Sequence, residues 1–111
     1  QVNGIFCCNE STGVGMLLAL RDAGLAGKVR FVAFDTGESL IAGLRSGHVD
    51  GLVAQNPMRM GYLGVKHMVD VLRGRPVPAR VDTGCVVVNL ANMESPEAKT
   101  VLAPPIDEYL R

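Results

Sequence analysis

The sequence has no excess of either charge, few cysteines and no long apolar run, and these shortages exclude several classes of protein. Eleven basic residues balance eleven acidic ones among 111, whereas a nucleic-acid-binding protein is normally basic. The longest notable apolar stretch, residues 14–20, is interrupted by Gly15. It is far shorter than the roughly 18 consecutive apolar residues that a membrane-spanning helix needs. We therefore expect neither a nucleic-acid partner nor a membrane span.

The three cysteines are odd in number and fit neither a disulfide framework nor a zinc site. Cys7 and Cys8 are adjacent and Cys85 stands far away in the sequence, so their redox state is left open. We expect no metal and no cofactor. The chain begins with Gln1 instead of Met and shows no charged leader region before its first apolar run. We interpret it as a processed product or a cut fragment.

What the sequence does contain is a regular alternation of short apolar runs and longer segments of helical period. This alternation is typical of a parallel β-sheet covered by helices. We therefore predict an α/β fold, a three-layer αβα arrangement around a parallel sheet. A chain of 111 residues has room for one domain or a piece of one.

Three strand–helix units follow one another along the first two thirds of the chain. The predicted strands are residues 4–8, 29–34 and 49–54. Each is followed by a helix that ends near a glycine, which can adopt the left-handed conformation of a helix C-terminus. The helices comprise residues 11–23 before Gly24, a helix with Leu40, Ile41 and Leu44 before Gly47, and a helix to about residue 73 before Gly74.

The third helix has the clearest start in the sequence. Asn56 can cap its free amides, and Pro57 occupies the first helical position without losing a hydrogen bond. Its apolar side chains recur at helical spacing, so we expect this helix to pack against the sheet. The stripe comprises Tyr62, Val65, Val69 and Leu72.

The last third of the chain begins with a connector. Two prolines within residues 75–80 forbid a helix and favour an extended chain. A β-branched run predicts a fourth strand within residues 81–90. Ser95 and Pro96 then begin a short helix as its cap and first residue, and residues 103–111 are expected to be irregular.

Polar residues end the three predicted parallel strands, where α/β proteins bind their ligands. Asn9, Asp35 and Gln55 follow the first, second and third strand and should share one edge of the sheet. Two amides and a carboxylate suit a ligand with many hydroxyl groups. Phosphate fits poorly, because Asp35 would repel it and no Lys or Arg ends these strands. Phe34, just before Asp35, can stack on a sugar face.

Each of these residues also has a plainer structural explanation. Asn9 and Asp35 are both ordinary helix caps, although Gln55 is not a favoured one. An enzyme would need a nucleophile with a base or a pair of tuned carboxylates. Cys8 and Asp35 are the only candidates, and His48 and His67 fall away from the strand ends. We therefore expect a binding protein without catalytic residues.

The segments around the strand ends resemble those of the periplasmic sugar-binding proteins of the ribose-binding type. GIFCCNE (residues 4–10), FVAFDTG (31–37) and GLVAQNP (51–57) match in order and spacing. Residues 44–51 are similar to the family's helix-to-strand connection, and residues 89–97 to its closing segment. The resemblance covers nearly the whole chain.

The resemblance implies the C-terminal part of a type I periplasmic-binding-protein fold. Such a two-lobed protein closes on a monosaccharide or related polyol outside the cytoplasm and delivers it to the membrane permease of an ABC importer. Position by position, the resemblance assigns hydrogen bonds with sugar hydroxyls to Asn9, Asp35 and Gln55 and a ring contact to Phe34. Glu10 stands where the family commonly has Asp.

The resemblance also implies a division of the chain. Residues 1–74 would hold three strand–helix units of the sugar-binding lobe, residues 75–80 a linker, and residues 81–111 the final strand, the interlobe crossing and the tail. The family's other lobe and the first strands of this one are absent from these residues. We therefore expect weak sugar binding by the chain alone and self-association through the open edge of the first strand.

Two other interpretations compete with the transport protein. The effector-binding domain of a lactose-repressor-like transcription regulator shares the same fold, although residues 44–55 look more like the transport family. A small α/β enzyme using Cys8 or Asp35 is the second alternative.

Overall fold

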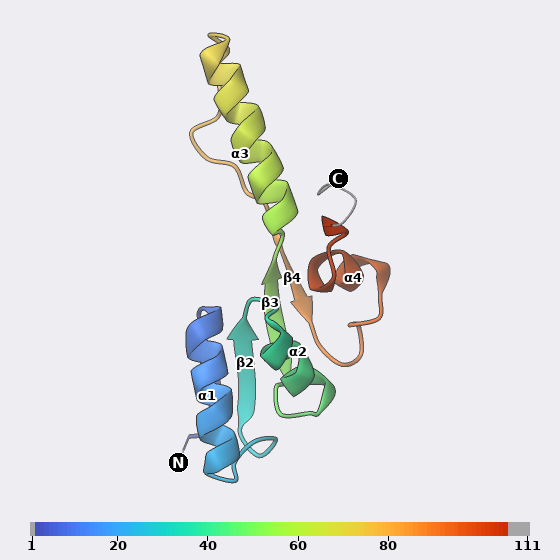
Figure 1. The fold of residues 1–111 in the computed structure, drawn as a ribbon. Coiled ribbons are helices and arrows are strands. Elements are labelled where there is room, and N and C mark those ends of the chain that lie inside the picture. Colours follow the sequence, from blue (N-terminus) through green and yellow to red (C-terminus); the bar gives the residue numbers. More distant parts are fainter. Residues whose placement is uncertain (1, 107–111) are drawn as a thin grey trace.

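Eight elements alternate between strand and helix along the chain. The structure, a computed structural model, describes residues 2–106 and is shown in Figure 1. The alternation confirms the predicted α/β fold. The elements are β1 (Gly4–Cys7), α1 (Glu10–Asp22), β2 (Arg30–Phe34), α2 (Glu38–Arg45), β3 (Gly51–Gln55), α3 (Pro57–Leu72), β4 (Cys85–Val88) and α4 (Pro96–Leu102).

The helix termini follow the predicted chemistry. Asn56 Oδ1 accepts a hydrogen bond from the Arg59 amide at 2.9 Å, and Ser95 Oγ accepts one from the Ala98 amide at 3.2 Å. A proline follows each of these caps in the first helical turn. The three helix-ending glycines all have positive φ, which an L side chain adopts only with strain. They are Gly24 (φ 65°), Gly47 (73°) and Gly74 (68°).

The strands form one sheet in the order β1-β2-β3-β4. The first three are parallel, as predicted, but β4 runs antiparallel to β3, with Leu52 opposite Val88 and Gln55 opposite Cys85. The expectation of a wholly parallel sheet is corrected for this strand. The reason lies in the connection: α3 leaves from the end of β3, and the chain returns to that same end (Figure 1). The next strand must therefore run back alongside β3.

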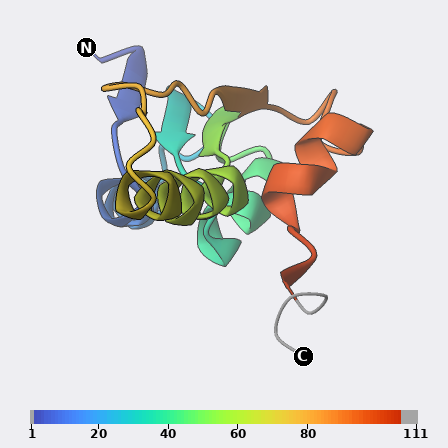
Figure 2. The same cartoon turned by 90° about the horizontal axis from the view of Figure 1, so that it is seen from above.

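The core lies on one face of this sheet. Phe31, Leu52 and Val88 point into it and are at most 1% exposed, and Leu40 and Leu44 of α2 meet them there. Figure 2 shows the helices on this side only. On the other face, Phe6 and Val87 are each 58% exposed. Residues 2–106 thus supply two of the three predicted layers.

Helix α3 projects away from the sheet and does not pack on it (Figure 1). None of its residues is buried, and Tyr62, Val65 and Leu72 are 68%, 68% and 79% exposed. The prediction that this helix packs against the sheet is therefore wrong. The apolar stripe was identified correctly, but a stripe states only that a face is apolar and not which surface covers it.

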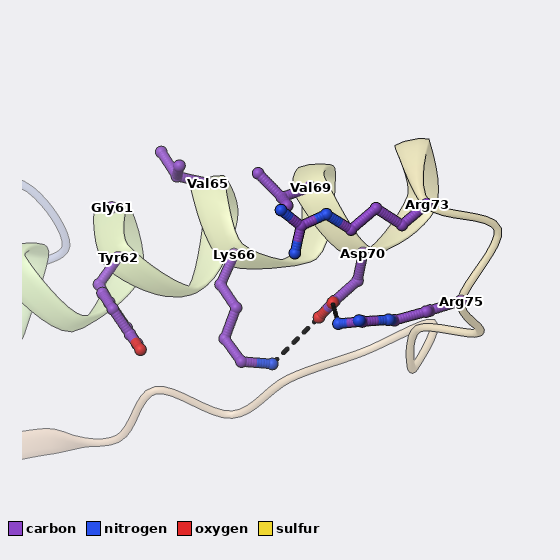
Figure 3. Close-up of a pocket in the computed structure, with 8 residues that line it drawn as sticks. All are labelled: Gly61, Tyr62, Val65, Lys66, Val69, Asp70, Arg73 and Arg75. Carbon is purple, nitrogen blue, oxygen red and sulfur yellow. Dashed lines mark hydrogen bonds and ion pairs between the residues drawn. The ribbon is translucent and has the colours of Figure 1, made fainter.

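The chain folds back along α3 after Gly74. An open groove of about 560 Å³ is lined by residues of α3 from Gly61 onward, by Arg73 at its end and by Arg75. Figure 3 shows Asp70 between two cations there, with Lys66 Nζ and Arg75 Nη1 each 3.1 Å from a carboxylate oxygen. The hydrogen bond from Lys66, followed by that from Arg75, holds the pKa of Asp70 below its ordinary value despite some desolvation. The division of the chain at residues 75–80 stays a prediction.

The excursion through α3 should be dispensable for the sheet. Gln55 and Cys85 are directly opposite each other, which is the spacing that a two-residue Asn-Gly hairpin turn bridges. We expect a chain in which Asn-Gly replaces residues 56–84 to retain cooperative thermal unfolding, measured by circular dichroism. Leu40→Ala, which removes a buried side chain, serves as the destabilised reference. Loss of the cooperative transition in the shortened chain would contradict the prediction.

Asp50 ties the starts of β2 and β3 together. Its carboxylate accepts hydrogen bonds from the Phe31 amide at 2.8 Å and from Arg30 Nη1 at 2.6 Å. Its own amide donates to the Phe31 carbonyl oxygen at 2.7 Å. Partial burial, the largest single influence, acts to raise the pKa of Asp50. The hydrogen bonds from Phe31 and Arg30 and the charge of Arg30 together outweigh it and hold the pKa below its ordinary value of 3.8.

A carboxyl group whose pKa is lowered by folding stabilises the folded state above its unfolded pKa, and this contribution is lost as the pH falls through the lower folded pKa. The stability of the chain should therefore decline below about pH 4, and Asp50→Asn should flatten that decline. Urea unfolding at a series of pH values measures the effect, with the exposed Asp22→Asn as control. An unchanged acid slope in Asp50→Asn would count against this role.

Within residues 2–106, no helix is long and apolar enough to cross a membrane. The predicted irregular tail begins after α4, and its residues 107–111 lie outside the described part of the chain.

Candidate functional site

The carboxyl ends of the parallel strands meet at the edge of the sheet from which α3 departs (Figure 1). Two of the predicted site residues touch there. Gln55 Nε2 donates a hydrogen bond to Asp35 Oδ1 at 2.7 Å, and both residues are half-buried. The Asp35 amide donates to the Val53 carbonyl oxygen at 2.9 Å. The ends of β2 and β3 are thus fastened to each other by a side-chain bond and a main-chain bond.

Asp35 has an uncommon backbone conformation. Its φ is 72°, and no other non-glycine residue of the described chain has a positive φ. Aspartate and asparagine tolerate this left-handed region better than other L residues. The turn carries the chain sharply from β2 toward α2 and leaves the Asp35 carboxylate facing Gln55.

A pocket of about 320 Å³ opens beside this pair. Two carboxylates, an amide and a hydroxyl face it, and neither lysine nor arginine contributes to its lining. The set offers several hydrogen-bond acceptors and the amide and hydroxyl donors that polyhydroxylated molecules require. The lining residues are Glu10, Asp35, Thr36, Gly37, Gln55, Pro57 and Met60.

Asn9 lies at the same edge but is committed to helix α1. Its Oδ1 accepts hydrogen bonds from the Thr12 amide at 2.9 Å, the Thr12 hydroxyl at 2.8 Å and the Ser11 hydroxyl at 3.1 Å. The capping explanation is therefore correct for this oxygen, and the side-chain amide nitrogen is the part left for a ligand. Asn9 does not line the pocket that Asp35 and Gln55 share.

Phe34 is half-buried and alternates along β2 with the buried Phe31 and Ala33 by strand period. Its ring therefore belongs to the sheet face that carries no helix, and it is not among the pocket residues. Its predicted contact with a ligand ring stays a prediction.

Sequence reasoning missed several residues of the pocket. Glu10 directly follows Asn9, and Thr36 and Gly37 directly follow Asp35. Their position in the loops directly after the strands could have identified them, because such loops face the ligand as much as the strand ends do. Pro57 and Met60 carried no such signal, since their helix was expected on the sheet.

The three cysteines lie outside the Asp35–Gln55 pocket. Cys7 is buried, Cys8 and Cys85 are exposed, and all three are free thiols. Among residues 2–106, no cluster of three or more His, Cys, Asp or Glu side chains could hold a metal ion. An open groove of about 710 Å³ lies between α2 and α4 and shares no lining residue with the Asp35–Gln55 pocket.

The sequence and the fold were compared with those of known proteins. The statistical model described as "Periplasmic binding protein domain" matches residues 1–76. The D-allose-binding periplasmic protein of Escherichia coli is 33% identical over 79 residues, which are 70% of this chain and 25% of that protein.

Two solved structures extend the likeness to the fold. An ABC transporter solute-binding protein from Agrobacterium vitis with bound D-fucose is 39% identical. The match covers 90% of this chain and 34% of that protein's chain, with a TM-score of 0.85. A second protein from that organism, bound with α-D-tagatopyranose, is 32% identical. The match covers 92% of this chain and 34% of that protein's chain, with a TM-score of 0.87.

The chain thus spans a quarter to a third of the length of these relatives. The likeness confirms the type I periplasmic-binding-protein fold that the sequence predicted. Since the family's model matches more than half of the sequence and the fold agrees over most of it, the chain belongs to the periplasmic binding protein family.

Proposed function

We propose that this chain forms part of the solute-binding component of an ABC importer and holds a monosaccharide or related polyol without covalent chemistry. The observation that carries the proposal is the hydrogen-bonded Asp35–Gln55 pair at the strand ends, facing a pocket of sugar size. Relatives with a bound D-fucose or α-D-tagatopyranose support the same class of ligand.

The chemistry of the pocket favours a neutral ligand. Asp35 uses one oxygen for Gln55, which leaves its other oxygen to accept from a sugar hydroxyl. The Gln55 amide nitrogen donates one proton to Asp35 and keeps a second one for a ligand, and its carbonyl oxygen can accept. The Thr36 hydroxyl donates to the Val101 carbonyl oxygen and can accept from a ligand. A sugar phosphate or an acidic sugar would meet the carboxylates of Glu10 and Asp35 without a cation in the lining, and like charges repel.

The site on this chain supplies only part of what tight sugar binding needs. Neutral hydrogen bonds contribute about 0.5–1.5 kcal/mol each, and charge-assisted ones about 1.5–3 kcal/mol. Against the entropic cost of holding a ligand, a few such bonds leave roughly millimolar affinity, about 4 kcal/mol. We propose that the other face of the sugar is bound by a second lobe.

An amide NMR titration with a panel of neutral monosaccharides tests the proposal at tens of millimolar sugar, the range set by a roughly millimolar dissociation constant. The panel includes D-fucose, D-allose and D-tagatose, with glycerol as a small polyol control. We expect shifts clustered at the pocket residues Glu10, Asp35, Thr36, Gly37 and Gln55 and at the neighbouring Asn9. A dispersed spectrum that does not respond to any sugar, or shifts clustered in the α2–α4 groove, would overturn the assignment of this site.

The remaining parts of the proposal concern the whole protein. Its partner would be a membrane permease and its location extracytoplasmic, in the periplasm for a Gram-negative source. The 111-residue chain by itself would also self-associate through β1, because β1 lies at the edge of the sheet and an edge strand exposes main-chain groups that can pair with another chain. A sedimentation experiment that shows only monomer at high concentration would contradict this self-association.

A further inference from the structure

The loop that presents Asp35 to the pocket is held from several sides. Asp35 is fastened to β3 through the Val53 carbonyl oxygen and the Gln55 side chain. Thr36 Oγ1 donates to the Val101 carbonyl oxygen of α4 at 3.4 Å. The third residue of the loop, Gly37, faces α1, where it contacts Glu10.

The Glu10 side chain lies directly on Gly37. A Cβ atom built on Gly37 would lie 2.6 Å from Glu10 Cδ and would also overlap Glu10 Oε1. Real Cβ atoms essentially never approach other heavy atoms below 3.0 Å. Glu10 therefore occupies the space that any other residue at position 37 would fill. The conformation of Gly37 does not itself require glycine, since its φ is −60°. A side chain at this position would have to displace the end of the Glu10 side chain.

The charge of Glu10 also suits its place. Gly37 is the N-cap of α2 and contributes no side-chain cap to the free amides of the first turn. A helix N-terminus carries partial positive charge, and a nearby carboxylate stabilises it. The carboxylate of Glu10 thus lies beside Gly37 at the start of α2, and Glu10 itself stands in the first turn of α1.

We infer that Glu10 is a positioning residue for the sugar site: by packing over Gly37 it fixes the turn 35–37 and, through it, the Asp35 carboxylate against Gln55. This role rests on the proposed function only in its final step, the effect on sugar binding. Glu10 lines the same pocket but acts through Asp35. The effect of its contact with Gly37 can therefore be measured at the Asp35–Gln55 hydrogen bond.

The first test needs no ligand. The side-chain NH₂ signals of Gln55 report its hydrogen bond to Asp35, so they serve as the readout in NMR spectra of the full 111-residue chain. We expect Glu10→Ala to move these signals and the Asp35 amide, whereas the isosteric Glu10→Gln keeps them close to the wild-type positions. The matched control is Glu38→Ala. Glu38 also neighbours Gly37 in sequence, but it lines the groove between α2 and α4, so the Gln55 side-chain signals should stay in place.

A double-variant cycle isolates the contact itself. Gly37→Ala should move the Gln55 side-chain signals in the wild-type background, because the new methyl group displaces Glu10. In the Glu10→Ala background the same change should have little effect, since the space is free. Such non-additivity is the signature of two residues in direct contact. Equal shifts in both backgrounds, or Gln55 signals that stay unmoved in Glu10→Ala, would overturn the inference.

The second test adds D-fucose and D-allose to the same variants. We expect Glu10→Ala to weaken binding of the responding sugar by about tenfold, as expected when a binding group loses its preorganised position, and Glu10→Gln to retain most of it. If the wild-type chain responds to neither these sugars nor the rest of the panel, the proposed function fails, while the ligand-free spectra still decide the role of Glu10. Well-dispersed signals from Phe31 and Leu44 confirm that each variant is folded.

Discussion

Replacing Gly43 with valine is expected to destabilise the fold by about 3 kcal/mol, the upper part of the range for overpacked cores. Gly43 is buried in α2, and a Cβ at this position would lie 2.8 Å from Val49 Cγ2 and 2.9 Å from Leu17 Cδ2. Both neighbours are themselves buried, at about 1% exposure, and cannot move aside without disturbing the rest of the core. A loss of this size is a large fraction of the roughly 5–15 kcal/mol that stabilises an ordinary domain.

The matched control for this substitution is another helical glycine with space around it. A Cβ at Gly15 of α1 would meet nothing within 4 Å, so Gly15→Ala should raise the free energy of unfolding by about 0.5–1 kcal/mol through helix propensity alone. Urea unfolding followed by circular dichroism measures both variants. If Gly43→Val unfolded at the same urea concentration as the wild type, helices α1 and α2 would not be packed as closely as described.

The second large effect concerns binding. Asp35→Asn should reduce the affinity for the responding sugar by about tenfold or more, because a charge-assisted hydrogen bond is replaced by a neutral one. Asparagine tolerates the positive φ of this residue and its carbonyl oxygen can still accept from Gln55. The fold should therefore be preserved. Asp35→Gly, which suits the same backbone conformation, should remove the carboxylate entirely and abolish the sugar response.

Asp50→Asn provides the control for Asp35→Asn. It makes the same chemical change at the opposite end of the same sheet, where Asp50 joins the starts of β2 and β3. It should leave the sugar-induced shifts unchanged while altering stability in acid. Equal loss of the sugar response in both variants would indicate a general change of the fold, and no loss in Asp35→Gly would move the site elsewhere.

Local signals in the sequence predicted most of the elements because their causes are local. The capping side chains of Asn56 and Ser95 and the prolines after them act within one helical turn. The glycines at positions 24, 47 and 74 end helices through their own φ angles. Predicted and observed boundaries therefore agree to within a few residues, and the three parallel strands appear in the predicted order.

The errors arise where the answer depends on distant parts of the chain. The direction of β4 is set by the route of α3, and nothing in the valine run at residues 86–88 encodes direction. The apolar stripe on α3 was read as a sheet-packing face, although the described chain leaves it exposed. Both errors have one physical origin: apolar patterning shows which residues are apolar, but neither the direction of a strand nor the surface that covers a helix.

The candidate site shows the same division. Asp35 and Gln55 follow their strands directly, so their meeting could be predicted from a parallel sheet alone. The place of Glu10 could not, because it depends on the space over Gly37, which is a property of how two helices approach each other. Phe34 shows the opposite case, because it directly precedes Asp35 in the sequence and yet does not line the pocket.

The route of the chain through α3 also has a consequence for the order of assembly. Residues 8–29 connect β1 to β2 and residues 35–50 connect β2 to β3, and each connection contains a helix with buried residues. Residues 56–84 between β3 and β4 contain α3, which has no buried residue. Closing a loop costs conformational entropy, and packing of the connecting helix offsets that cost only for the first two connections. We therefore expect β1 to β3 with α1 and α2 to form the folding nucleus of the chain, and β4 with α4 to dock onto it last.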